Sequence, residues 1–129
     1  MKRMVLDAPI VASWFQPDGA GRALRAEYEA GALEILGPRH LPQDVLAALA
    51  LHADADGDLL GRIGLEIERL GFHLRDASTA ELARWIARGL PAHRAAYAAL
   101  AAELDLPLVS DDEELRGLAG PRARSSGDA

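Results

Sequence analysis

Short apolar runs alternate along this chain with longer segments in which apolar residues recur at helical spacing. These short segments predict a buried strand over residues 3–7 and further strand candidates over 33–38, 72–76 and 106–110. The helical period predicts helices over residues 22–31, 41–51, 58–71, 78–89 and 91–105, and a short helix or connector over 10–15. Ser78 and Glu81 have the spacing of a capping box at one helix start.

Strands that alternate with helices favour βαβ units and a parallel sheet covered on both faces. We therefore expect an α/β fold, a three-layer α/β/α sandwich with a short parallel sheet of four or five strands. No linker or internal repeat divides the chain, so one domain is expected over residues 1–119. Residues 120–129 are polar, and we expect them to form a disordered tail.

Composition narrows the class of protein further. The net charge of −6 argues against a protein that coats nucleic acid with its whole surface. Cysteine is absent, which excludes disulfides and thiolate metal sites. No apolar run reaches the roughly 18 residues of a membrane span, and the first residues lack the long apolar stretch of a secretory signal. The expected location is the cytoplasm, with no membrane contact.

Carboxylates fall where the predicted strands end. Asp7 closes the first strand, and Asp111 and Asp112 follow the fourth. Asp44 lies in the first turns of the helix after the second strand. Sites in open α/β sheets lie outside the carboxyl ends of the strands, so these acids are expected at one edge.

Converging carboxylates repel one another. At about 4 Å and an effective dielectric near 20, each pair costs roughly 4 kcal/mol. A hard divalent cation such as Mg²⁺ or Mn²⁺ relieves that repulsion and prefers oxygen ligands. Acids with such an ion, and without cysteine or paired histidines, suggest metal-assisted hydrolysis of a phosphodiester. Asp7, Asp44 and the adjacent Asp111 and Asp112 are the candidate ligands for such an ion.

The sequence resembles the PIN-domain ribonucleases, and most closely the VapC-type toxins of toxin–antitoxin pairs. The resemblance rests on "VLDAPIVASWF", "PRHLPQDVLAAL" and "PAHRAAYAALAAELDLPLVSDDEEL", whose order and spacing extend along nearly the whole chain. Asp7 matches the first metal-binding Asp of the family, and Asp44 stands where the family usually has Glu. Asp112 matches the Asp two residues after the Ser or Thr that ends the fourth strand, here Ser110.

The resemblance implies an endoribonuclease that cuts RNA with a water activated by one Mg²⁺ or Mn²⁺ ion, with Asp7, Asp44 and Asp112 as its catalytic and metal-binding residues. Asp111 or water would complete the metal shell. The implied substrate is RNA, such as tRNA or another structured RNA, and the implied protein partner is a cognate antitoxin. A homodimer formed through helices outside the active edge is also expected.

Two positions depart from the family pattern. The family carries another metal-directed Asp three residues before a helical Tyr, but counting back from Tyr97 gives Arg94. Pro9 stands where the family has Ser, Thr or Asn. Replacing one of four carboxylates by guanidinium changes the local charge from about −4 to −2 and weakens the reason to bind a divalent ion.

Two hypotheses follow from Arg94. In the first, the three aspartates still hold one metal ion and the chain is a nuclease. In the second, Arg94 pairs with Asp7 or Asp112 as an internal counter-ion. The pocket is then self-neutralised, and the chain is a catalytically degenerate PIN-like module that binds a protein.

Other interpretations have less support. Residues 54–66 place Asp at three calcium-loop positions, but Leu59 and Leu65 occupy the positions that need Gly and Glu, so we reject a calcium site. A receiver domain would need two adjacent acids near the first strand, where only Asp7 stands. We expect the histidines at surfaces or helix ends. Trp14, Trp85, Tyr28 and Tyr97 are expected to pack in the core or an interface.

Overall fold

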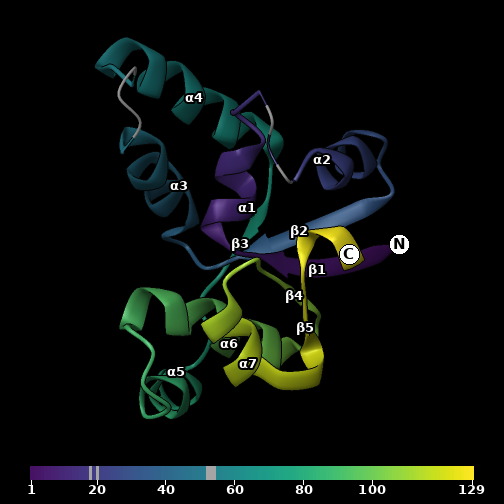
Figure 1. Ribbon diagram of the computed structural model, residues 1–129, viewed down its shortest axis with the longest axis vertical. Coiled ribbons are helices and arrows are strands. Elements are labelled where there is room, and N and C mark those ends of the chain that lie inside the picture. Colours follow the sequence, from purple (N-terminus) through teal and green to yellow (C-terminus); the bar gives the residue numbers. More distant parts are fainter. Residues whose placement is uncertain (18, 20, 52–54) are drawn as a thin grey trace.

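The computed structural model describes residues 1–17, 19, 21–51 and 55–129. Within these residues, a five-stranded parallel sheet has the order β3-β2-β1-β4-β5 (Figure 1). The strands are β1 (Lys2–Leu6), β2 (Leu33–Gly37), β3 (His73–Leu74), β4 (Leu108–Val109) and β5 (Ala123–Arg124). The helices are α1 (Ala8–Ser13), α2 (Arg22–Glu29), α3 (Leu41–Ala50), α4 (Gly57–Leu70), α5 (Thr79–Ile86), α6 (Ala92–Leu104) and α7 (Glu113–Ala119). The short 3-10 helices η1 (Gly120–Arg122) and η2 (Ser126–Asp128) flank β5.

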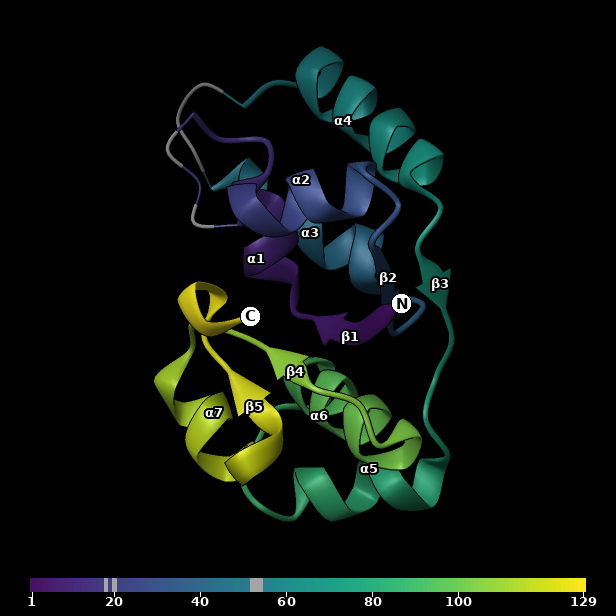
Figure 2. The ribbon, with the colours of Figure 1, turned by 90° about the vertical axis from the view of Figure 1, so that its right-hand side faces the viewer.

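The helices lie in two layers on opposite sides of the sheet. Figures 1 and 2 show α1, α2, α3 and α4 on one side, and α5, α6 and α7 on the other. The predicted three-layer α/β/α sandwich with a short parallel sheet is confirmed.

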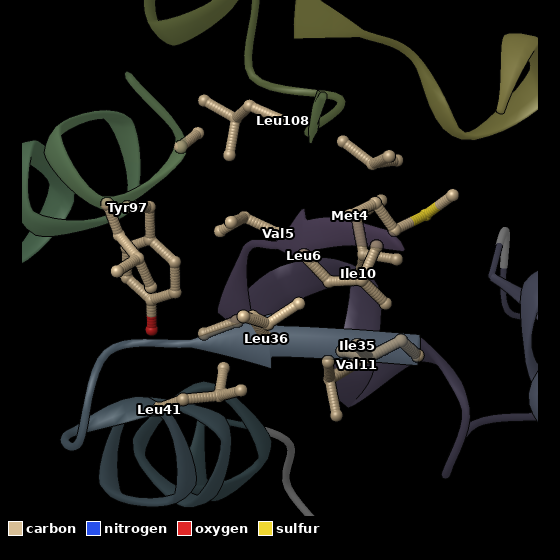
Figure 3. Close-up of a cluster of buried hydrophobic side chains, with 14 of the residues drawn as sticks. Met4, Val5, Leu6, Ile10, Val11, Ile35, Leu36, Leu41, Tyr97 and Leu108 are labelled. Carbon is tan, nitrogen blue, oxygen red and sulfur yellow. The ribbon is translucent and has the colours of Figure 1, made fainter. Parts of the chain in front are cut away.

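The core is centred on β1, which pairs with β2 on one side and with β4 on the other. Val5 and Leu6 are completely buried. Figure 3 shows Leu36 on one side of them and Leu108 on the other. A strand covered on both faces needs a continuous apolar run, and this explains the run at the start of the sequence.

Helix starts follow the sequence closely, with one difference. Ser78 caps α5, because its hydroxyl accepts the backbone N–H of Glu81 at 3.2 Å. The reciprocal half of the predicted capping box is replaced, since the Ser78 N–H donates to the Glu103 carboxylate at 3.0 Å. The Glu81 side chain instead accepts from the Trp85 indole.

The C-terminal residues have more structure than the sequence pattern predicts. In the segment expected to be a disordered tail, β5 pairs in parallel with β4, and the Ser110 N–H donates to the Arg124 carbonyl at 2.9 Å. Main-chain pairing does not depend on an apolar side-chain pattern, so a polar segment can add an edge strand. Asp54 of the rejected calcium loop lies outside the described residues.

Candidate functional site

Asp7, Asp44 and Asp112 line one cavity of roughly 230 Å³. Asp7 follows β1 and caps α1, accepting the Ile10 N–H at 3.2 Å. Asp112 follows β4 and caps α7, accepting the Leu115 N–H at 3.1 Å. Asp44 lies in the first turn of α3. The structure therefore brings together the three residues that the sequence pattern selects, at the carboxyl end of the sheet.

Asp7 is the most deeply placed of these carboxylates, with only 4% of its surface exposed. Burial raises the pKa of Asp7 from 3.8 to about 6, because the charged form loses its hydration. Hydrogen bonds from Ser110 and Ile10 oppose this rise in pKa; the charge of Asp111 adds to it, and that of Arg94 slightly offsets it. Asp7 is thus protonated more readily than an ordinary carboxyl group.

Arg94, on α6, lines the same cavity and forms an ion pair with Asp112 through Nη2 and Oδ2. This is one of the two partners that the sequence analysis considers for Arg94. The side chains of Arg94 and Asp112 are 34% and 24% exposed, so water reaches the pair.

Asp44 is held by side chains from α6 and from its own helix start. Its Oδ2 accepts a hydrogen bond from the Tyr97 hydroxyl at 2.9 Å and lies 3.3 Å from His40 Nε2. His40 Nε2 also lies 3.1 Å from the His93 carbonyl oxygen. Burial and the nearby Asp44 charge raise the pKa of Tyr97, which keeps its hydroxyl protonated as a donor.

Ser110 and Asp111 have different roles in the loop that carries Asp112. Ser110 is completely buried, and its hydroxyl accepts the Asp112 N–H at 3.0 Å. Asp111 points to the C-terminal segment, where its two oxygens accept the Ser126 N–H and hydroxyl at 2.8 and 2.7 Å. Asp111 is not among the residues that line the cavity.

A divalent metal does not fit this arrangement of side chains. Among the described residues, no group of three or more His, Asp or Glu side chains is placed to hold a metal ion. The carboxylates already have other partners: Arg94 for Asp112 and Tyr97 for Asp44. The oxygen ligands are of the type that Mg²⁺ prefers, but they are not gathered around one point.

Sequence reasoning gave too little weight to three residues at this site. Tyr97 was expected in the core or an interface, and its ring does pack in the core (Figure 3). Its hydroxyl in addition donates to Asp44. His40 and His93 lie at the starts of α3 and α6, as expected of helix-end histidines, and in addition His93 lines the cavity and His40 contacts Asp44. Helical spacing could have indicated that Tyr97 reaches the site, since Arg94 and Tyr97 are three residues apart and share a helix face.

No family model matches the sequence, and no curated protein matches it. The fold is a PIN-like α/β/α sandwich, and several solved structures are similar to it. Within the part of the chain that the structure describes, none of the helices combines the length and apolar character that crossing a membrane requires.

Three solved structures illustrate the likeness. PAE2754 from Pyrobaculum aerophilum has a TM-score of 0.72 at 22% identity, over 98% of this chain and 90% of that one. FitAcB from Neisseria gonorrhoeae has a TM-score of 0.70 at 15% identity, over 96% and 98%. FitAB bound to the IR36 DNA fragment has a TM-score of 0.67 at 14% identity, over 95% and 94%. At these identities the likeness shows a shared fold.

Proposed function

We propose that this chain is a toxin-type PIN-like protein whose acidic pocket is neutralised from within, and that it acts by binding a protein partner. The observation that carries the proposal is the ion pair between Arg94 and Asp112 inside the cavity. Its expected partner is an antitoxin, as the sequence resemblance implies. Metal-dependent RNA cleavage is then weak or absent.

The charge of the cavity supports this proposal. Asp7, Asp44 and Asp112 with Arg94 carry a formal charge of about −2, whereas an acid at position 94 would make it about −4. The raised pKa of Asp7 lowers the negative charge further near pH 6. A divalent cation therefore has less to gain here than in a cavity with four carboxylates.

The ion pair between Arg94 and Asp112 contributes little free energy by itself. Its side chains are 34% and 24% exposed, and pairs in contact with water contribute at most about 1 kcal/mol. That corresponds to about a five-fold change in affinity. The larger effect of Arg94 comes from its positive charge and from the carboxylate ligand that it replaces.

Calorimetric titration with Mn²⁺ tests the proposal on the wild type, Arg94→Asp and Arg94→Ala. We expect heat of binding from Arg94→Asp, weaker heat from Arg94→Ala, and none from the wild type. Arg94→Lys keeps the cation and is expected to behave as the wild type. Arg84→Asp makes the same charge change on α5, where Arg84 pairs with Glu81 at 3.1 Å, and controls for net charge. Equal binding by the wild type and Arg94→Asp would end the proposal.

A second candidate is an Mg²⁺- or Mn²⁺-dependent endoribonuclease that uses Asp7, Asp44 and Asp112. The observation that favours it is their convergence on one cavity. Incubation with total bacterial RNA and either metal tests it, with Asp7→Asn as the control. RNA fragments from the wild type but not from Asp7→Asn would replace the first proposal by this one.

The proposed protein partner is supported by the sequence resemblance and by the solved structures with a similar fold. One similar structure is FitAB bound to a DNA fragment. We expect the neighbouring open reading frame to encode a small DNA-binding antitoxin that co-purifies with this chain. Light scattering of the chain alone would test the expected homodimer. Failure of the neighbour to bind would contradict the proposed role.

A further inference from the structure

The C-terminal strap, residues 122–128, is attached to the body of the protein at several points. At its start, the Arg122 guanidinium donates to the Asp105 carboxylate at 3.0 Å and to the Leu106 carbonyl at 3.3 Å. In its middle, the Arg124 carbonyl accepts the Ser110 N–H at 2.9 Å. Near its end, Ser126 binds Asp111. Two of these attachments, at Ser110 and Asp111, lie on the loop that leads to the acid cavity, which is the cavity lined by Asp7, Asp44 and Asp112.

The contact between Ser126 and Asp111 uses the whole carboxylate. One oxygen accepts the backbone N–H of Ser126 at 2.8 Å, and the other accepts its hydroxyl at 2.7 Å. Hydrogen bonds to a charged group are stronger than neutral ones, and two parallel bonds also fix the orientation of the side chain. Asp111 is therefore turned toward the strap, whereas the next residue, Asp112, lines the cavity, and the preceding Ser110 bonds to Asp7.

We infer that the strap restrains the acid cavity, because Ser126 keeps Asp111, a fourth carboxylate, out of it. The lack of a metal-binding group then has two causes within the chain: Arg94 occupies Asp112, and Ser126 occupies Asp111. This inference rests on the proposed self-neutralised cavity, since it explains why a further carboxylate ligand is missing from that cavity.

Two further observations agree with this restraint. The charge of Asp111 already acts on Asp7 and helps to raise its pKa. Asp111 is also exposed, so no packing of its own side chain opposes a rotation toward the cavity. Release of its two hydrogen bonds is what the movement requires.

Ser126→Pro in the full-length chain breaks the contact with little disturbance of the backbone. Ser126 is the first residue of η2, a position where proline is well tolerated. Ser125 has φ −78° and ψ 165°, the extended conformation preferred before proline. Proline has neither the N–H nor the hydroxyl that hold Asp111. Ser126→Ala removes the hydroxyl alone and serves as the milder variant.

Mn²⁺ affinity, measured by calorimetry and by electron paramagnetic resonance, is the first readout. The variants are the wild type, Ser126→Pro, Arg94→Asp and the combined Arg94→Asp/Ser126→Pro. Because one extra carboxylate near a divalent ion in a hydrated site changes its affinity on the order of ten-fold, we expect the combined variant to bind about ten-fold more tightly than Arg94→Asp. Ser126→Ala in the same background is expected to give a smaller gain.

Adding Asp111→Asn supplies the control, since an amide lacks the charge that the metal needs. The gain from Ser126→Pro should then disappear. A second readout is hydrogen exchange at the Asp112 and Leu115 amides, which we expect to become faster in Ser126→Pro because the loop loses an anchor.

The outcomes separate this inference from the proposed function. Equal affinity of Arg94→Asp with and without Ser126→Pro overturns the strap, and so does a gain that survives Asp111→Asn. Equal affinity of the wild type and Arg94→Asp overturns the self-neutralised cavity instead. Absence of binding in every variant overturns both.

Discussion

The parallel strands begin at the amino edge of the sheet and end at its carboxyl edge, and the charged groups at these two edges have opposite surroundings. At the amino end, Arg3 and His73 lie 3.5 and 3.4 Å from the Glu34 carboxylate, and their side chains are largely in water. At the carboxyl end, Asp7 is 4% exposed and Ser110 is completely buried. The pair of Arg3 and Glu34 at the amino edge stays hydrated, and such pairs contribute about 0–1 kcal/mol to stability. The carboxyl edge removes a carboxyl group from water.

This difference shows which edge carries the site. A buried carboxyl group with a raised pKa costs stability at neutral pH, and groups of this kind concentrate at functional positions. The exposed pairs of the amino edge have an ordinary explanation as a solvated surface. Substitutions at the two edges should therefore differ in their effect on stability.

Asp7→Asn should stabilise the protein at neutral pH. Because the pKa of Asp7 is raised from 3.8 to about 6, the folded state binds its proton more tightly than the unfolded state, and stability falls as pH rises between these values. Above pH 6 the ionised Asp7 lowers the free energy of unfolding by about 3 kcal/mol. Asparagine still caps α1. Urea unfolding should show the variant more stable above pH 7 and equal to the wild type below pH 4; a gain that does not change with pH would contradict the assignment.

Ser110→Ala should destabilise the protein by about 1–2 kcal/mol, since it leaves buried polar groups without a partner. It should also raise the pKa of Asp7 further, because the Ser110 hydroxyl lowers it. Unfolding experiments and an NMR titration of the Asp7 carboxyl measure the two effects. Ser13→Ala is the matched control: its buried hydroxyl bonds to the Ile10 carbonyl and the Gly21 N–H. That control should lose stability without moving the Asp7 pKa.

Tyr97→Phe should cost about 1 kcal/mol, because it removes the hydrogen bond to Asp44 and little else. A double-mutant cycle with Asp44→Ala isolates the interaction between the two side chains. The expected coupling is most of the single-variant loss. Fully additive effects would show that the hydrogen bond contributes nothing to stability.

Glu34→Gln, at the amino edge, should change stability by less than about 1 kcal/mol. The effect should vanish at high salt, since solvent ions screen exposed pairs. Unfolding at low and high ionic strength measures it. A loss as large as that of Ser110→Ala would remove the contrast between the two edges.

Most of the helices and strands could be predicted from the sequence, because each depends on a local pattern of apolar residues. The continuous apolar run of β1 marked a strand buried on both faces, and the periodic segments marked the helices. β3 and β4 are shorter than the strands predicted over 72–76 and 106–110, because only two residues of each pair with a neighbouring strand. β5 could not be predicted, since its pairing depends on the main chain and not on its polar side chains.

The positions of the acids were also predictable, but their partners were not. Parallel strands direct their carboxyl ends to one edge, so Asp7 and Asp112 had to approach one another. Whether Arg94 would pair with Asp7 or Asp112 depended on distances that no spacing encodes, and the structure selects Asp112. Ser126 lies 15 residues beyond Asp111 in a segment with no pattern, and only the folded chain reveals their contact.

We expect Arg94 to keep a divalent ion out of the cavity lined by Asp7, Asp44 and Asp112. In crystals of the wild type and of Arg94→Asp, grown with Mn²⁺, anomalous diffraction at the manganese absorption edge locates the ion. An anomalous peak among the three aspartates is expected in the variant and none in the wild type. A peak of equal height in the wild type would show that Arg94 does not exclude the ion.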